Sequence, residues 1–113
     1  MTVTLFHNPK CGTSRNALAL LREHGVEPVV VEYLKAGWDR ATLERLAAKT
    51  GGGVAGLLRR KEAEAAALLA SGADDETIIA AAVAQPILIE RPIVESEKGV
   101  VIGRPAERVL DAL

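Results

Sequence analysis

The sequence predicts an α/β fold, a mixed four-stranded sheet with a helical block inserted between the second and third strands. Three observations support this prediction. Residues 3–34 contain two short β-branched runs on either side of a segment with helical apolar spacing. Residues 38–85 carry only helical signals, and residues 87–113 return to two short strands and a final helix.

Length and composition are those of one globular domain, which we expect to span residues 1–113 with the helical insertion at about 38–85. Hydrophobic residues make up 49% of the chain but aromatic residues only 3%, so the core is expected to be aliphatic. The net charge of −1 argues against nucleic acid or a membrane surface as a partner. Because a membrane-length apolar window and a signal-peptide layout are both lacking, we expect a cytoplasmic protein.

Cysteine and histidine usage narrows the chemistry further. Cys11 is the only cysteine, which excludes an intrachain disulfide and a Cys-rich zinc site. His7 and His24 are far apart in the sequence and form a poor metal pair, so neither a metal nor a bound cofactor is expected. Any redox reaction of Cys11 must therefore use a thiol from outside the chain.

The N-terminal strand–helix–strand unit determines where this cysteine lies. Residues 3–6 have the content of a strand, and residues 17–21 follow the spacing of a helix. Pro9 and Gly12 mark a tight turn between the two elements. A second strand is expected at residues 29–34, parallel to the first and reached through a right-handed crossover.

Cys11 is therefore expected at the N-terminus of a helix. The first amides of a helix lack partners within it, and the helix dipole favours negative charge there, so this thiol should ionise more easily than a free one. An oxyanion beside it would meet the N–H groups of Gly12 and Thr13. Lys10 and Arg15 add positive charge. A cysteine that only fills the core would be expected in an apolar run instead.

The helical block has recognisable ends. Asp39 is expected to cap a helix that ends at the glycines 51–53. An alanine-rich helix follows at residues 62–70. Asp74 or Asp75 is expected to cap a third helix, which stops at the next proline.

The C-terminal part completes the sheet. Residues 91–95 are typical of a strand entered through a proline, residues 96–99 of a turn, and residues 100–102 of a strand that pairs back antiparallel. Pro105 then opens a helix whose apolar stripe ends at Leu113. With the helical block removed, this order of elements is that of a thioredoxin-like fold with helices on both faces of its sheet.

Three arginines stand at predicted element boundaries: Arg59, Arg91 and Arg104. Such positions are where a thioredoxin-like sheet presents side chains around the loop after its first strand. The planar guanidinium group binds two oxygens of a tetrahedral oxyanion at once. For each arginine taken alone, a solvated surface charge is the alternative interpretation.

Together these features resemble the glutaredoxin-coupled arsenate reductases and the wider arsenate-reductase-like group. The resemblance covers nearly the whole chain in the same order. It rests on residues 7–16, which read His-Asn-Pro-Lys-Cys-Gly-Thr-Ser-Arg-Asn, and on residues 57–59, 86–94 and 104–105.

The resemblance implies a role for each matching position. Cys11 would be the nucleophile that attacks arsenate, with His7 favouring the thiolate through charge and Ser14 through a hydrogen bond. The groups that would bind the oxyanion are Arg59, Arg91, Arg104, Gly12, Thr13 and Arg15.

The resemblance also implies partners and one backbone feature. Glutathione would be the co-substrate and would leave a Cys11–glutathione mixed disulfide, which glutaredoxin would then reduce. The peptide bond between Arg91 and Pro92 is expected to be cis, because thioredoxin-like folds hold a cis-proline facing the active cysteine.

Two other functions remain open at this stage. A glutathione-linked thiol oxidoreductase of another substrate would share a reactive Cys11 without turning over arsenate. A non-enzymatic regulator of the transcription-factor-binding type shares the inserted fold, although such regulators commonly carry Cys-x-x-Cys and Ser14 stands in the second place here. A low-molecular-weight tyrosine phosphatase is disfavoured, since its Cys-x5-Arg loop differs from the spacing of Cys11 and Arg15.

Overall fold

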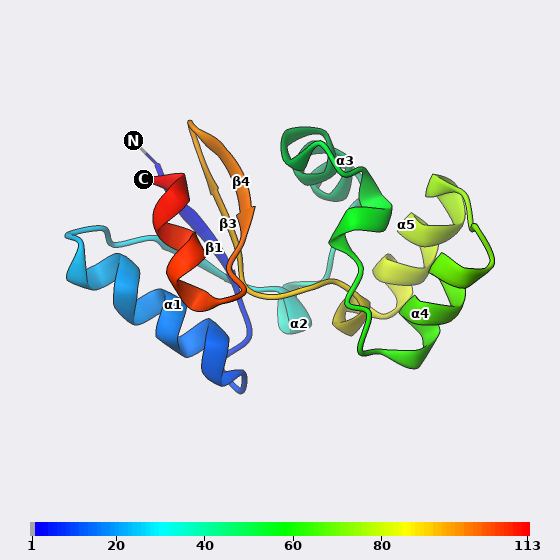
Figure 1. Cartoon of the computed structure of the whole chain (residues 1–113), viewed down its shortest axis with the longest axis horizontal. Coiled ribbons are helices and arrows are strands. Elements are labelled where there is room, and N and C mark those ends of the chain that lie inside the picture. The colour runs from blue at the N-terminus through cyan, green and yellow to red at the C-terminus, as the bar shows by residue number, and fades with distance from the viewer. Residues whose placement is uncertain (1) are drawn as a thin grey trace. The chain divides into compact units, whose positions relative to one another are not determined.

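The computed structural model describes residues 2–113. These residues form two compact units (Figure 1). One unit comprises the described residues up to Ala36 together with Arg91–Leu113, and it holds the sheet. The other is Gly37–Glu90. Its limits agree with the helical insertion expected at about 38–85. That the whole chain is one domain stays a prediction.

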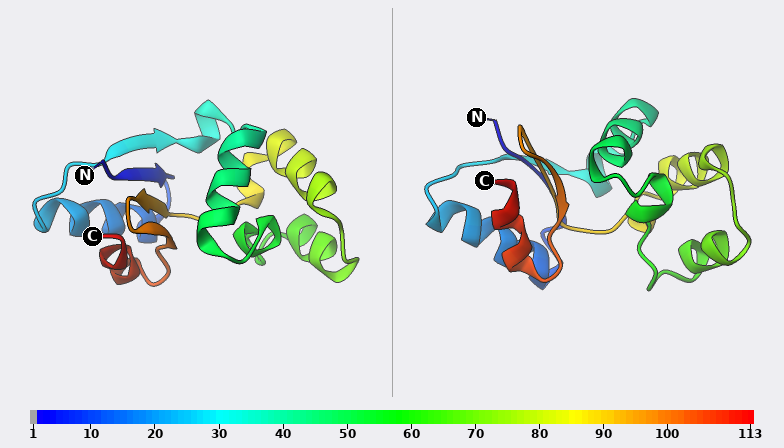
Figure 2. Two further views of the ribbon diagram at one scale, coloured as in Figure 1. Left: turned by 90° about the horizontal axis from the view of Figure 1, so that it is seen from above. Right: turned by 45° about the horizontal axis from the view of Figure 1, so that its top comes forward.

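The first unit is built on a mixed four-stranded sheet, as predicted. Its strands are β1 (Thr4–His7), β2 (Val29–Glu32), β3 (Ile93–Ser96) and β4 (Gly99–Ile102), in the order β2-β1-β3-β4 (Figure 2, left). β1 pairs parallel with β2 and antiparallel with β3, and β3 pairs antiparallel with β4. The central position of β1 fixes the point at which the chain leaves the sheet for the cysteine turn.

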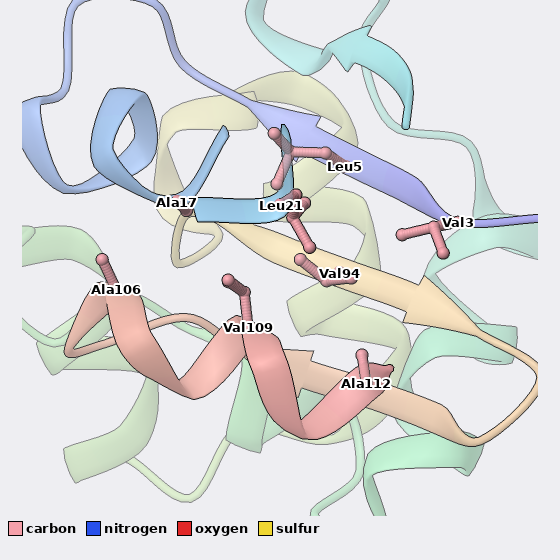
Figure 3. Packing of buried hydrophobic residues seen from close by; sticks show 8 residues of the cluster. All are labelled: Val3, Leu5, Ala17, Leu21, Val94, Ala106, Val109 and Ala112. Atoms are coloured by element: carbon pink, nitrogen blue, oxygen red, sulfur yellow. The ribbon is translucent and has the colours of Figure 1, made fainter. Parts of the chain in front are cut away.

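Two helices of this unit pack on the same face of the sheet, namely α1 (Gly12–Glu23) and the 3₁₀ helix η3 (Ala106–Ala112). Figure 3 shows Leu5 and Val94 pointing from the strands toward both helices. The sequence had suggested helices on both faces. Both apolar stripes instead meet on one face, where the buried cluster comprises Val3, Leu5, Ala17, Leu21, Val94, Ala106, Val109 and Ala112.

The second strand is shorter than the residues 29–34 expected from the sequence. Tyr33 begins a single helical turn, α2 (Tyr33–Ala36), and its side chain is fully buried. The register explains the early end of β2, because Glu32 is opposite His7, the last residue of β1. No residue of β1 remains for Tyr33 to pair with.

The second unit is helical, as predicted. It consists of α3 (Arg40–Thr50), α4 (Ala63–Ala70) and α5 (Asp75–Ala84), with the 3₁₀ turns η1 (Val54–Leu57) and η2 (Pro86–Leu88). The three α-helices are the green to yellow coils of Figure 1.

The predicted helix ends in this unit are confirmed. The Asp39 side chain accepts the Thr42 N–H at 2.7 Å, and Asp74 accepts the Thr77 N–H at 2.9 Å. α3 ends at Gly51, which adopts a left-handed conformation (φ 78°) that glycine reaches without the strain of a Cβ atom.

Candidate functional site

Cys11 lies at the N-cap of α1, directly after the turn that follows β1. Its carbonyl oxygen accepts the Arg15 N–H at 3.0 Å, the first hydrogen bond of the helix, while its own backbone is extended (φ −92°, ψ 122°). The thiol is half-buried. The predicted position at a helix N-terminus is confirmed.

The turn itself is held by Asn8, a residue without a role among those predicted from the sequence. The Asn8 carbonyl accepts the Cys11 N–H, and the Asn8 side-chain oxygen accepts the Lys10 N–H, both at 3.0 Å. Asn-Pro is a turn-initiating pair, so Asn8 followed by Pro9 was a usable signal for this role.

Arg104 and Arg91 converge on the Cys11 sulfur from the far end of the sequence. Nη1 of Arg104 lies 3.9 Å from Cys11 Sγ and donates to the backbone carbonyl of Arg91 at 3.1 Å. The Arg91 side chain also hydrogen bonds to the Cys11 sulfur. The Arg91–Pro92 peptide bond is cis, as expected, and so is Arg104–Pro105, which the sequence analysis did not predict.

Gly103, the residue before Arg104, allows the Arg104 segment to lie close to Pro92 and Val109. An atom added as Cβ on Gly103 would lie 2.5 Å from Cγ1 of Val109 and 3.0 Å from Cγ of Pro92. The Gly103 N–H donates to the Pro92 carbonyl at 2.9 Å. Close contact between backbone and side chains at Gly103 therefore places Arg104 beside the segment that carries Arg91.

These contacts change the acidity of the thiol. Burial is the largest single influence and raises the pKa of Cys11. Three groups act against burial: the backbone amide of Ser14 and the guanidinium groups of Arg91 and Arg104. Their combined effect is larger than that of burial, so the pKa of Cys11 falls from 9.0 to about 7. About half of the Cys11 side chains are thus thiolate, the nucleophilic form, at neutral pH.

His7 and Ser14 lie beside the cysteine turn and hydrogen bond to each other, and Ser14 also favours the thiolate through a hydrogen bond, as expected. Burial lowers the pKa of His7, with Glu32 opposing this shift and Arg15 and Arg22 reinforcing it. The lowered pKa of His7 disfavours its charged imidazolium form, and the role of His7 in favouring the thiolate stays a prediction. The Ser14 hydroxyl binds His7 Nδ1 at 2.6 Å and accepts the Asn8 N–H at 3.1 Å, so the hydrogen bond to sulfur comes from the Ser14 backbone.

Gly12, Thr13 and Arg15 form the first turn of α1 beside the thiol. The Arg15 guanidinium donates to the Pro9 carbonyl at 3.0 Å, which ties the first helical turn to the loop. Arg15 Nη2 would be 3.6 Å from a Cβ on Gly12, so it lies over a residue without a side chain. Anion binding by these three residues stays a prediction.

Arg59 belongs to the other compact unit. It is 9% exposed, its Nη1 donates to the Glu90 carboxylate at 2.6 Å, and its Nε lies 4.0 Å from Glu62. Backbone hydrogen bonds join the same segments, from Arg59 N–H to the Leu88 carbonyl and from Glu90 N–H to the Leu57 carbonyl, both at 2.7 Å. Arg59 is an ion-pair partner within its own unit, and its assignment to oxyanion binding stays a prediction.

Neither a metal-binding cluster nor a membrane-spanning helix is found among residues 2–113. No three His, Cys, Asp or Glu side chains gather closely enough to hold a metal ion in this part of the chain. No helix formed by the same residues has the length and hydropathy needed to cross a membrane.

A four-stranded mixed sheet with a cis-proline, and a low-pKa cysteine at the mouth of its first helix, define a thiol-chemistry protein of thioredoxin-like fold. The model of the ArsC family matches residues 6–112, and the chain belongs to that family.

Individual relatives agree with this assignment. The chain is 47% identical to an arsenate reductase of Rhizobium meliloti, over 100% of this chain and 82% of that protein. It is 42% identical to an arsenate reductase of Escherichia coli, over 98% of this chain and 80% of that protein. The solved structure of an arsenate reductase from Vibrio cholerae superposes with a TM-score of 0.90 at 39% identity, covering 100% of this chain and 98% of that one.

Proposed function

We propose that this chain reduces arsenate to arsenite through the Cys11 thiolate, with glutathione and glutaredoxin as the source of electrons. The observation that carries the proposal is the thiol of pKa about 7 that Arg91 and Arg104 contact. A nucleophile held beside two guanidinium groups suits an electrophile that is itself an oxyanion. Relatives named arsenate reductase match the chain over nearly its whole length.

In the first step the Cys11 thiolate attacks the arsenic atom of arsenate. A sulfur–arsenic bond forms, and one arsenate oxygen leaves as water after it has gained protons. In this proposal Arg91 and Arg104 offset the charge of the remaining oxygens, and the amides of Gly12 and Thr13 donate to them. The product is a Cys11 thiol–arsenate adduct in which arsenic is still pentavalent.

In the second step glutathione supplies the second sulfur. Its thiol joins Cys11 in a disulfide, arsenic takes the two electrons, and arsenite leaves. The balance is one Cys11 thiol, one glutathione and one arsenic acid giving one mixed disulfide, one arsenous acid and one water. Glutaredoxin then reduces the mixed disulfide by thiol–disulfide exchange and restores the Cys11 thiol. External thiols complete the cycle because Cys11 is the only cysteine of the sequence.

The test is arsenate-dependent oxidation of NADPH in the presence of glutathione, glutaredoxin and glutathione reductase. We expect turnover with the wild-type chain and none with Cys11→Ser. Arg91→Ala should raise the arsenate concentration needed for half-saturation, since the variant retains the thiol but lacks one cation of the site. Lys49→Ala, on the exposed surface of α3, is the matched control for removal of a cation.

The alternatives give different results when this assay is combined with alkylation of Cys11 and exposure to oxidised glutathione. A thiol oxidoreductase of another substrate would show rapid alkylation of Cys11 at pH 7 and no arsenate-dependent turnover. A non-enzymatic regulator would show neither turnover nor a glutathione mixed disulfide after exposure to oxidised glutathione. Turnover that persists in Cys11→Ser would remove this residue from the mechanism.

A further inference from the structure

We propose that Asn8 is a positioning residue that holds the Cys11 turn in its reactive shape. This inference deepens the proposed function, because it concerns the same nucleophile. Asn8 is 5% exposed, although asparagine is a residue usually found at the surface. A buried polar side chain needs a hydrogen-bonding partner within the protein, and the partner of Asn8 lies in the turn.

Three atoms of Asn8 bind three different residues. The side-chain oxygen accepts the Lys10 N–H at 3.0 Å, and the backbone carbonyl accepts the Cys11 N–H at 3.0 Å. The backbone N–H donates to the Ser14 hydroxyl at 3.1 Å. Asn8 thus connects the end of β1 to both the tip of the turn and the first turn of α1.

These contacts decide which amides of the turn are engaged. The N–H groups of Lys10 and Cys11 are both taken up by Asn8, and the Arg15 N–H by the Cys11 carbonyl. The Ser14 N–H is directed to the Cys11 sulfur. Among the N–H groups of residues 10–15, those of Gly12 and Thr13 thus remain for a bound oxyanion.

The side chain makes one of the three connections, and that connection can be removed by substitution. Without the side-chain oxygen, the Lys10 N–H loses its partner and the turn gains freedom next to Cys11. A displaced Cys11 would move away from the Ser14 amide and from Arg104 Nη1, which lies 3.9 Å from the sulfur. Both contacts favour the thiolate, so loosening of the turn should make the thiol less acidic.

The experiment measures the rate of alkylation of Cys11 by iodoacetamide from pH 5.5 to 9.5. For Asn8→Ala we expect the midpoint of the pH profile to rise and the rate at pH 7 to fall about threefold to fivefold, in line with a smaller thiolate fraction. Asn8→Ser retains a short hydroxyl acceptor, so its profile should lie between those of wild type and Asn8→Ala.

Asp74→Ala is the matched control, because it also removes a side-chain acceptor of a backbone N–H, at 2.9 Å from Thr77, but in the other compact unit. We expect it to lower stability without moving the alkylation midpoint. If Asn8→Ala does not fold, a raised midpoint in Asn8→Ser supports the proposal by itself. Unmoved midpoints in the folded Asn8 variants would overturn it. The readout needs neither arsenate nor glutathione, so its failure is distinguishable from failure of the proposed function.

Discussion

The Arg104 guanidinium lies 3.9 Å from the sulfur of Cys11, although the two residues are separated by most of the chain. The same nitrogen donates to the carbonyl of Arg91 at 3.1 Å, so the guanidinium is held between the two groups. Together with the Ser14 backbone amide and Arg91, this fixed cation explains how a thiol that burial makes less acidic nevertheless ionises near neutral pH.

Loss of Arg104 should therefore make the thiol less acidic. For Arg104→Ala we expect the alkylation midpoint of Cys11 to rise by about one pH unit, which lowers the rate at pH 7 about fivefold. Arg108→Ala removes an exposed cation from η3, the 3₁₀ helix that follows Arg104, and should leave the midpoint unchanged. Equal profiles for the two variants would show that Arg104 does not act on the sulfur.

The lowered pKa of Cys11 should also appear in the pH dependence of stability. An acidic group whose pKa is lower in the folded state stabilises that state at pH values above its unfolded pKa, and this contribution disappears as pH falls through the folded value, about 7. The free energy of unfolding of wild type relative to Cys11→Ser should thus increase from pH 6 to pH 9. Urea unfolding followed by circular dichroism measures it, and a constant difference over this range would contradict the pKa.

Gly103→Ala should disrupt both packing and the site. The added methyl group would lie 2.5 Å from Val109 Cγ1 and 3.0 Å from Pro92 Cγ, so one of these side chains must move. We expect a loss of about 1–3 kcal/mol in stability, typical of overpacking, together with a higher alkylation midpoint. Gly56→Ala is the control, because a Cβ there meets nothing within 4 Å. A melting temperature equal to that of the control would mean that the backbone at Gly103 adjusts freely.

Arg59→Ala should lower stability whatever its part in anion binding. The Glu90 carboxylate, 20% exposed, would lose a guanidinium at 2.6 Å, and we expect a cost of about 2 kcal/mol. The adjacent Arg60 is exposed, so Arg60→Ala should stay within about 0.5 kcal/mol of wild type. Chemical denaturation of the two variants gives the difference. A change in arsenate half-saturation for Arg59→Lys, which keeps the charge but not the planar fork, would support the oxyanion role as well.

Much of the fold could be predicted because local signals coincide with element boundaries. Pro9 and Gly12 delimit the cysteine turn, and Asp39 and Asp74 cap helices where the sequence indicates. The end of β2 could not be predicted in this way. Tyr33 favours a strand by composition, and it becomes helical because the neighbouring strand has already ended at His7.

The contacts of Ser14, Arg91 and Arg104 with Cys11 agree with residues that the sequence indicated, but how each group acts could not be predicted from the sequence. The cysteine at a helix N-terminus follows from spacing alone, whereas the charge of His7 depends on burial, which the sequence does not show. Ser14 illustrates the same limit. Its hydroxyl and its backbone amide have different partners, and only the three-dimensional structure separates them.

Besides the nearby Ser14 amide, the groups that lower the pKa of Cys11 are supplied by residues 91 and 104, so the thiol becomes fully reactive only when both ends of the chain have come together. In most proteins folding protects a cysteine from reagents. Here the thiol of an unfolded molecule is mostly protonated at pH 7 and reacts slowly with electrophiles, whereas the thiol of the native molecule reacts faster. Labelling at neutral pH would therefore mark the native population selectively, and chains that are still incomplete or misfolded would leave cellular thiols and oxyanions largely untouched.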